Sequence, residues 1–247
     1  VLELGEGVMP AFCGRWLAGF GAAVVKVEPP GGDWTRRYRL DPAEADRYGP
    51  DGSALFTYLN AGKELIALDP GTAAGRERLR RLCEAADVLV HTLTPGQLAA
   101  WNLDLTALRA RRPELVEVAV SPFGEDGPYA ARAATSIVLL ALGGYQYLTG
   151  EPGRPPLALP GLQPDYLTAL YAVVAALAGV VRRLREGRGG RIELTALEAL
   201  ASLHQFTVSL YLTQGVIRGR HGSRWQNLYP ITLLPCRDGY LGFAITL

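Results

Sequence analysis

Hydrophobic and polar positions alternate along residues 1–120 with two different periods. Short apolar runs without a polar face are typical of strands buried on both sides of a parallel sheet. Between them, apolar residues recur every three or four positions, as at Leu79, Leu82 and Cys83, which indicates helices with one buried face. The predicted strands are Val1–Leu4, Ala22–Val27, Leu65–Leu68, Val88–Val90 and Leu115–Val120. This repeated β-α order predicts an α/β fold built on a doubly wound parallel sheet.

The segments between and after these strands complete the prediction. Pro29–Asp51 is rich in proline, glycine and charge and is predicted as a long surface loop. The predicted helices are Ala11–Phe20, Gly71–Ala86, a stretch ending at Arg111, a segment near Ile137–Tyr147, Asp165–Arg185 and Leu197–Thr213. Arg191–Leu194 is predicted as a further strand, and Ile231–Leu234 with Tyr240–Ile245 as a β-hairpin.

One apolar run could be mistaken for a membrane span. Tyr166–Val181 contains sixteen residues without a charge, whereas a spanning helix needs roughly 20 apolar residues. We therefore predict a buried helix of a core and no contact with a membrane.

Composition removes several classes of protein. With 25 Lys+Arg against 24 Asp+Glu, the net charge of +1 and the lack of a basic run argue against a nucleic-acid partner. A hydrophobic content of 49% excludes a disordered chain. The three cysteines contain no CxxC pair, which argues against a disulfide framework or zinc site and favours a reducing, cytoplasmic location. The three histidines are widely separated, so no metal site is predicted, and His204 is interpreted as a satisfied core residue.

Two cations are candidates for binding phosphate. Arg36 follows the second predicted strand, on the side where parallel sheets bind ligands, and Lys63 lies on the next loop. An arginine fork suits phosphate, although most arginines in such a chain are solvated surface groups. Gly5-Glu6-Gly7 invites a dinucleotide-binding interpretation, but Pro10 stands where the third glycine belongs, so a tight turn is predicted instead.

Asp165 is the candidate nucleophile. It precedes a long apolar helix, where an aspartate commonly caps the free amides. The same position would hold a carboxylate ionised for nucleophilic attack. Pattern alone favours the capping role and leaves both open.

Many short motifs, in consistent order along nearly all 247 residues, resemble the family III CoA-transferases, which include carnitine-CoA transferase and bile-acid-inducible proteins. The matching segments are Leu17–Pro30, Gly32–Arg36, Leu59–Asp69, Ala86–Val90, Phe123–Tyr129, Leu148–Pro152, Gly187–Gly189, Tyr229–Pro230 and Pro235–Gly239. The resemblance implies a large Rossmann-like domain, here residues 1–200, leading into the start of a smaller domain at residues 201–247. It also implies an interlocked homodimer. Because family members continue well beyond Leu247 and the chain begins at Val1, we expect it to be part of a longer protein.

The resemblance also implies a reaction. An aspartate that aligns with Asp165 attacks the acyl-CoA carbonyl, and a mixed anhydride is exchanged for an aspartyl-CoA thioester. The acceptor, a carboxylic acid, then reverses the steps. Arg36 and Lys63 match positions that contact CoA. Acyl-CoA and a carboxylic acid are thus the expected substrates, with CoA as the carried group and no metal.

Several positions depart from the family pattern. The loop that touches CoA in relatives, usually Asn-Phe-Arg-Pro-Gly, here is Thr92–Gly96. Ser136 replaces a common acidic residue, and Thr135 replaces the histidine base of the family's racemases. These departures leave two alternatives to the transferase. The first is a non-catalytic or degenerate CoA-binding member, such as half of a tandem protein. The second, ranked below it, is a 2-methylacyl-CoA racemase.

Overall fold

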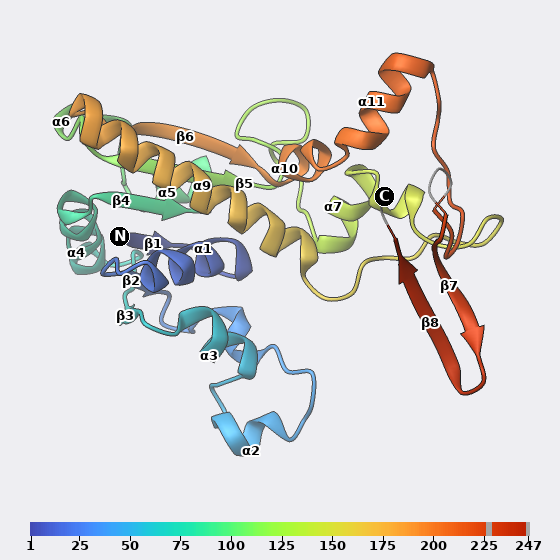
Figure 1. Cartoon of the computed structure of the whole chain (residues 1–247). Coiled ribbons are helices and arrows are strands. Elements are labelled where there is room, and N and C mark those ends of the chain that lie inside the picture. Colours follow the sequence, from blue (N-terminus) through green and yellow to red (C-terminus); the bar gives the residue numbers. More distant parts are fainter. Residues whose placement is uncertain (226–228, 246–247) are drawn as a thin grey trace. The chain divides into compact units, whose positions relative to one another are not determined.

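The computed structural model describes residues 1–225 and 229–245 (Figure 1). Contacts divide the chain into two compact units. The first contains Val1–Ala133 and Pro164–Ala199, and the second contains Ala134–Gln163 and Leu200–Leu247. The assignment of residues 1–200 and 201–247 to a CoA-binding domain and the start of a small domain stays a prediction.

A six-stranded, wholly parallel sheet forms the centre of the first unit. Its strands are β1 (Leu2–Leu4), β2 (Val25–Glu28), β3 (Glu64–Ala67), β4 (Val88–His91), β5 (Val116–Ser121) and β6 (Gly190–Thr195). Their order is β3-β2-β1-β4-β5-β6, and every neighbouring pair is parallel. This confirms the predicted α/β fold with a doubly wound parallel sheet.

Helices cover both faces of the sheet, and each face has its own apolar core. One core joins Leu2 and Leu89 of the strands to Leu79 and Leu108. These last two belong to α4 (Ala73–Ala85) and α6 (Leu105–Arg111), and α5 (Pro95–Ala100) lies beside them. A second core joins alternate strand residues, such as Val90, to α1 (Val8–Gly19) and α9 (Gln163–Glu186).

The sheet has a switch point between β1 and β4. The chain goes from β1 toward β2 and β3 on one side, then returns to β4 on the other, so the loops after β1 and β4 diverge there. Gly5 has a φ of +114°, and a Cβ atom on it would lie 2.1 Å from Thr92 Oγ1. Glycine is therefore required at Gly5 because the two loops touch.

Pro29–Asp51 is not the single long loop that we predicted. It contains a 3₁₀ turn, η1 (Trp34–Arg37), and a short helix, α2 (Glu44–Tyr48); α3 (Ala54–Asn60) follows. The Asp33 side chain accepts a hydrogen bond from the Thr35 amide at the start of η1. The Ser53 hydroxyl caps α3 by accepting from the Phe56 amide. Polar side chains thus cap η1 and α3, whereas α2 has no side-chain cap among the described residues.

Helix α9 differs from its prediction in two ways. It begins at Gln163, so Asp165 lies inside the first turn and is not the N-cap residue. Only 33% of its most apolar window is buried, although we predicted a buried helix. The length and apolar composition of α9 are those of a membrane-spanning helix, but core helices of water-soluble proteins meet the same two criteria. Here one side of the helix packs on the sheet through Ala172, Val173 and Ala176.

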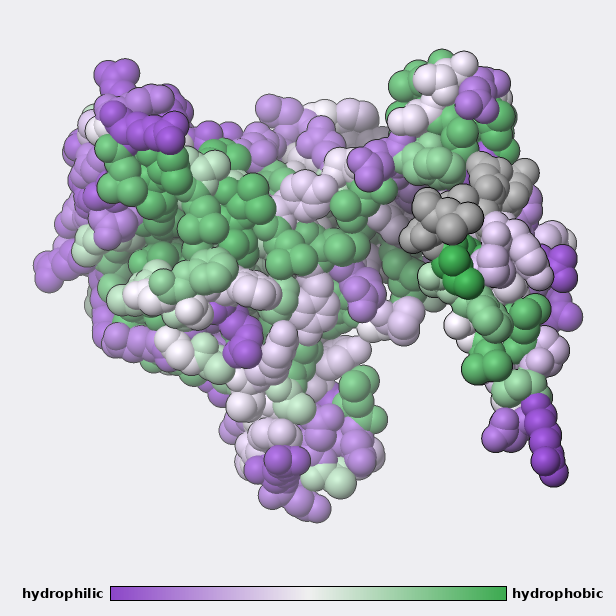
Figure 2. All heavy atoms as spheres, viewed as in Figure 1, coloured by the Kyte–Doolittle hydropathy of each residue, from purple (hydrophilic) through white to green (hydrophobic). Residues whose placement is uncertain are grey.

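The outer side of α9 carries a continuous apolar stripe. The exposed side chains recur at i, i+4, i+7, i+11 and i+14: Leu170, Val174, Leu177, Val181 and Leu184. Figure 2 shows apolar side chains gathered along this face of α9. This spacing follows the seven-residue repeat with which helices pair.

The second unit consists of short helices and a hairpin. Its elements are α7 (Ser136–Leu142), α8 (Tyr145–Leu148), α11 (Gln205–Gln214), β7 (Ile231–Cys236) and β8 (Gly239–Ala244), and α10 (Ala196–Ser202) crosses the boundary between the units. The antiparallel pairing of β7 and β8 confirms the predicted hairpin.

Two predicted helices are each interrupted. Gly144, with a φ of +83°, separates α7 from α8, and His204 precedes α11. His204 is half-buried, and its Nε2 atom has no hydrogen-bond partner among the described residues. The interpretation of His204 as a satisfied core residue was therefore wrong.

Candidate functional site

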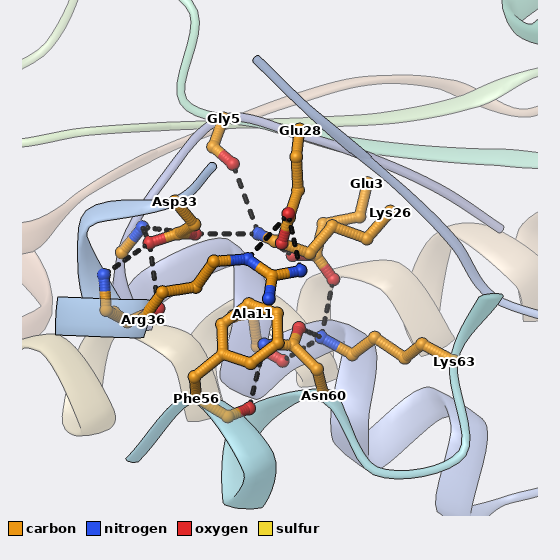
Figure 3. Close-up of polar contacts among 12 residues, drawn as sticks. Glu3, Gly5, Ala11, Lys26, Glu28, Asp33, Arg36, Phe56, Asn60 and Lys63 are labelled. Carbon is orange, nitrogen blue, oxygen red and sulfur yellow. Dashed lines mark hydrogen bonds and ion pairs between the residues drawn. The ribbon is translucent and has the colours of Figure 1, made fainter. Parts of the chain in front are cut away.

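Both lysines of the chain are buried in one ion network on the α1 face of the sheet (Figure 3). Lys26 Nζ lies 2.8 Å from Glu3 Oε1 and 2.9 Å from Asp33 Oδ2. Lys63 Nζ lies 2.7 Å from Glu3 Oε2. All four side chains are completely shielded from solvent. Two ammonium groups face two carboxylates, so the buried charges balance.

The strand register builds this network. Glu3 and Lys26 are directly paired on adjacent parallel strands, so their side chains leave the same face. Helix α1 crosses close above them: a Cβ atom on Gly14 would lie 2.2 Å from Glu3 Oε2. Lys63 also donates to the Ala11 carbonyl and to Asn60 Oδ1, at 2.7 and 3.1 Å. The end of α3 is thereby fixed to α1.

The buried charges perturb one another's titration. Burial alone would lower the pKa of Lys26, but the carboxylates of Glu3 and Asp33 outweigh burial and raise it. Burial dominates for Lys63, whose pKa is lowered although Glu3 opposes this. For Asp33, burial is outweighed by Lys26 and the Thr35 amide, so the pKa is lowered. Asp33 also accepts from the Gly7 amide at 3.0 Å, which ties the loop after β2 to the start of α1.

Arg36 lies at the edge of this network. Its Nε and Nη2 atoms lie 2.9 and 2.8 Å from Glu28 Oε2, and its guanidinium stacks 3.8 Å from the centre of the Phe56 ring. Its side chain keeps 26% of its surface exposed, whereas that of Lys63 keeps none. The two predicted phosphate ligands thus differ in access, and their role in CoA contact stays a prediction.

A cavity of about 220 Å³ opens at the carboxyl ends of β1 to β4. Its walls are mainly apolar, formed by Leu4, Val27, Leu68, Leu79, Leu93 and Trp101. Polar side chains at the cavity include Glu6, Thr92 and Gln97. The described residues that line it include no lysine or arginine. Sequence reasoning missed the cavity, although its place at the strand ends beside the switch point is where such sheets bind ligands.

Asp165 lies at the same edge of the sheet, on the α9 face. Because α9 ends at Glu186 and β6 begins at Gly190, α9 runs back along the sheet and its first turn lies toward the carboxyl ends of the strands. Asp165 is half-buried in that first turn, where the helix dipole favours a negative charge.

Aromatic side chains pack together beside this turn, which sequence reasoning did not predict. The Tyr166 ring meets Phe12 edge-on at 4.8 Å, and Phe12 stacks on Tyr58 at 6.2 Å. Burial, together with the nearby Tyr58 and Asp165, raises the pKa of the Tyr166 hydroxyl. The residue next to Asp165 is therefore packed among aromatic rings.

Comparison with known proteins decides the family. The model of CoA-transferase family III matches residues 1–246. The chain belongs to this family. It is 35% identical to succinyl-CoA–D-citramalate CoA-transferase of Chloroflexus aurantiacus, over 97% of this chain and 58% of that protein. It is 31% identical to succinate–glutarate CoA-transferase of Agrobacterium fabrum, over 99% of this chain and 62% of that protein.

Solved structures agree with this assignment. A CaiB/BaiF family protein from Brucella suis superposes with a TM-score of 0.89 at 34% identity, covering 97% of this chain and 63% of that one. A hypothetical protein from Mycobacterium tuberculosis, 23% identical with a TM-score of 0.82, covers 98% and 62% and shows the fold alone. This family III chain thus spans about three fifths of the length of these proteins.

Proposed function

We propose that this chain is part of an enzyme that transfers CoA from an acyl-CoA to a carboxylic acid, with Asp165 as nucleophile. Membership of CoA-transferase family III supports the reaction class. The observation that carries the role of Asp165 is its place in the first turn of α9, half-buried at the carboxyl edge of the sheet and next to Tyr166, which packs on Phe12.

The proposed steps conserve the acyl activation. An Asp165 carboxylate oxygen attacks the acyl carbonyl carbon, the C–S bond breaks, and CoA leaves as a thiolate. The thiolate attacks the aspartyl carbonyl of the mixed anhydride, releasing the donor's carboxylate and leaving an aspartyl-CoA thioester. The acceptor carboxylate attacks this thioester, and the thiolate then attacks the acyl carbonyl of the new anhydride. Asp165 is regenerated, and no ATP is required because anhydride and thioester are both activated.

The aromatic surroundings support this chemistry. Phe12, Tyr58 and Tyr166 reduce the access of water to the turn that carries Asp165. Both intermediates react with water, so exclusion of solvent would favour transfer over hydrolysis.

We place the nucleotide part of CoA in the cavity at the ends of β1 to β4. The loop Thr92–Gly96, which touches CoA in relatives, contributes Thr92 and Leu93 to its wall. The apolar walls suit a flat purine ring, and polar groups at the rim suit ribose. Arg36, with part of its guanidinium exposed, is the proposed phosphate ligand, and Lys63 acts by holding the structure behind it.

The names of several relatives suggest the donor. The relatives from Chloroflexus aurantiacus and Haloarcula hispanica are named for succinyl-CoA as well as for a dicarboxylate acceptor. We therefore propose succinyl-CoA as the donor and a dicarboxylic acid as the acceptor for the whole protein, in the cytoplasm.

One observation favours the non-catalytic alternative. Thr94 stands where relatives have an arginine in the CoA loop, and the described lining of the cavity contains no cation. A chain that bound CoA and turned over no substrate would support this alternative.

The stripe on α9 supports the proposed homodimer. Leu177 and Val181 lie near its middle and are 40% and 46% exposed. Covering such a stripe with a second copy would remove this apolar surface from water. Sedimentation of the wild type and Leu177→Lys tests the proposal: a dimer that becomes a monomer supports it, and a wild-type monomer contradicts it.

Loss of transfer on substitution of Asp165 tests the proposed function. Asp165→Ala and Asp165→Asn should abolish transfer of CoA from succinyl-CoA, while Asp104→Asn, which alters the capping aspartate of α6, should retain it. Full activity in Asp165→Ala would exclude Asp165 as the nucleophile.

A further inference from the structure

His91 ends β4, directly before the loop that forms part of the cavity wall. Its side chain is 1% exposed. Its Nδ1 atom accepts a hydrogen bond from the Leu93 amide at 3.3 Å, and its Nε2 atom lies 3.4 Å from Glu117 Oε1. One ring therefore connects a buried carboxylate of β5 to the backbone of the loop.

These contacts fix the tautomer of the ring. Because Nδ1 accepts a hydrogen bond from a backbone amide, it cannot carry a proton. The proton of the neutral ring is then on Nε2, which donates to the Glu117 carboxylate. The hydrogen bond at one nitrogen thus sets what the other nitrogen can do.

Glu117 is itself held from two further sides. It is 1% exposed, and it pairs with Arg109 of α6 and with Arg191 of β6, whose Nε lies 3.2 Å from Oε1. Burial would raise the pKa of Glu117, but hydrogen bonds from His91 and Arg109 outweigh burial and lower it. The carboxylate stays ionised and remains an acceptor for the His91 ring.

The restrained backbone belongs to the cavity. Thr92 and Leu93 both line it. The Thr92 amide donates to the Leu4 carbonyl of β1 at 3.2 Å, and the Leu93 amide donates to His91. Two successive amides of the wall are therefore fixed, one by the neighbouring strand and the other by the His91 ring.

We propose that His91 is a positioning residue, which, together with Glu117, holds the Thr92–Leu93 wall in the shape that receives the nucleotide part of CoA. The identity of the ligand rests on the proposed function, whereas the restraint on the Leu93 amide does not. The proposal therefore has one readout on the protein alone and one with CoA.

Two substitutions separate the two hydrogen bonds of the ring. His91→Leu removes both hydrogen bonds, so hydrogen exchange of the Leu93 amide should accelerate. The Kd for CoA should rise by roughly ten-fold, which corresponds to the net free energy of one hydrogen bond. His91→Asn places an amide oxygen near the position of Nδ1 and should restore much of the Leu93 protection. Leu115→Ala, a core substitution at the opposite edge of the sheet, is the control for general destabilisation.

The measurements are Leu93 amide exchange by NMR, CoA affinity by calorimetry, and kcat with succinyl-CoA. The proposal is supported if His91→Leu shows faster Leu93 exchange and weaker CoA binding while kcat at saturating succinyl-CoA is unchanged. Both effects should be smaller in His91→Asn. Unchanged Leu93 exchange in His91→Leu overturns it, as does faster exchange without loss of CoA affinity. If the wild type does not bind CoA, the placement of CoA in the cavity fails, while the exchange data still decide the role of His91.

Discussion

The sheet holds two clusters of buried charge on opposite faces, and they differ in how they are closed. The cluster of Glu3, Lys26, Asp33 and Lys63 is wholly shielded, with equal numbers of positive and negative groups. The cluster around Glu117 has a buried carboxylate, but its arginines keep about a quarter of their surface exposed, 23% for Arg109 and 29% for Arg191. A closed cluster cannot rehydrate when one member is lost, whereas exposed arginines can turn to water.

This difference separates their roles. The lysine cluster joins β1, β2, α1 and α3, and its four side chains are shielded from solvent, so we expect it to act on the structure behind the site. The Glu117 cluster reaches the cavity wall through His91. The predictions below test this division, from the largest expected effect to the smallest.

Removal of Lys26 should destabilise the protein most. Lys26→Met leaves Asp33 buried without its cation and Glu3 with only Lys63, and breaking a buried pair typically costs about 3–5 kcal/mol. Urea unfolding of wild type and variant measures the effect. A loss below 1 kcal/mol, of the kind seen for exposed pairs, would show that the cluster is not closed as described.

Acid should weaken the lysine cluster through Asp33. The pKa of Asp33 is lower in the folded protein than in an unfolded chain, so its stabilising contribution is complete above the ordinary aspartate value, about 3.9, and is lost as the pH falls through the folded pKa. Unfolding free energies measured between pH 7 and pH 3 should decline less steeply for Asp33→Asn than for the wild type. Parallel declines would contradict this role.

Substitution of Glu117 should cost less than substitution of Lys26. In Glu117→Gln the charge-assisted hydrogen bonds are weakened, but Arg109 and Arg191 can turn to solvent, so we expect a loss of about 1–2 kcal/mol. The same urea experiment measures it. A loss equal to that of Lys26→Met would remove the distinction between the clusters.

Arg36 should matter least for stability. The Glu28 carboxylate is buried, but the Arg36 guanidinium that covers it is 26% exposed, so Arg36→Ala opens Glu28 to water and should lower the free energy of unfolding by about 1 kcal/mol. Affinity for CoA, measured by calorimetry, should fall, while Arg37→Ala on the same turn serves as the control. Equal CoA affinity in the two variants would exclude Arg36 as a phosphate ligand.

The sequence was sufficient to predict the parallel sheet, because its strands are apolar runs separated by helical periodicity. It was not sufficient for the burial of Lys63, because the partner Glu3 is distant in the chain and only the fold brings them together. A signal was present: Glu3 and Lys26 interrupt otherwise apolar strands. Charged residues at such positions indicate a buried pair.

Other parts of the site depend on tertiary contacts. Asp165 was identified by its alignment with the family, but the start of α9 at Gln163 and the aromatic rings of Phe12 and Tyr58 come from packing between distant helices. The exposure of α9 was missed because an apolar sequence does not say which surface will cover it.

The most direct test of the account is covalent trapping at Asp165. The full chain is incubated with succinyl-CoA and digested, and the peptide that contains Asp165 is analysed by mass spectrometry, with Asp165→Asn as the control. We predict a mass increase equal to CoA minus water on Asp165 in the wild type, removable by hydroxylamine and absent in the variant. Catalytic transfer of CoA without this adduct, or with the adduct on another residue, would contradict the proposed mechanism.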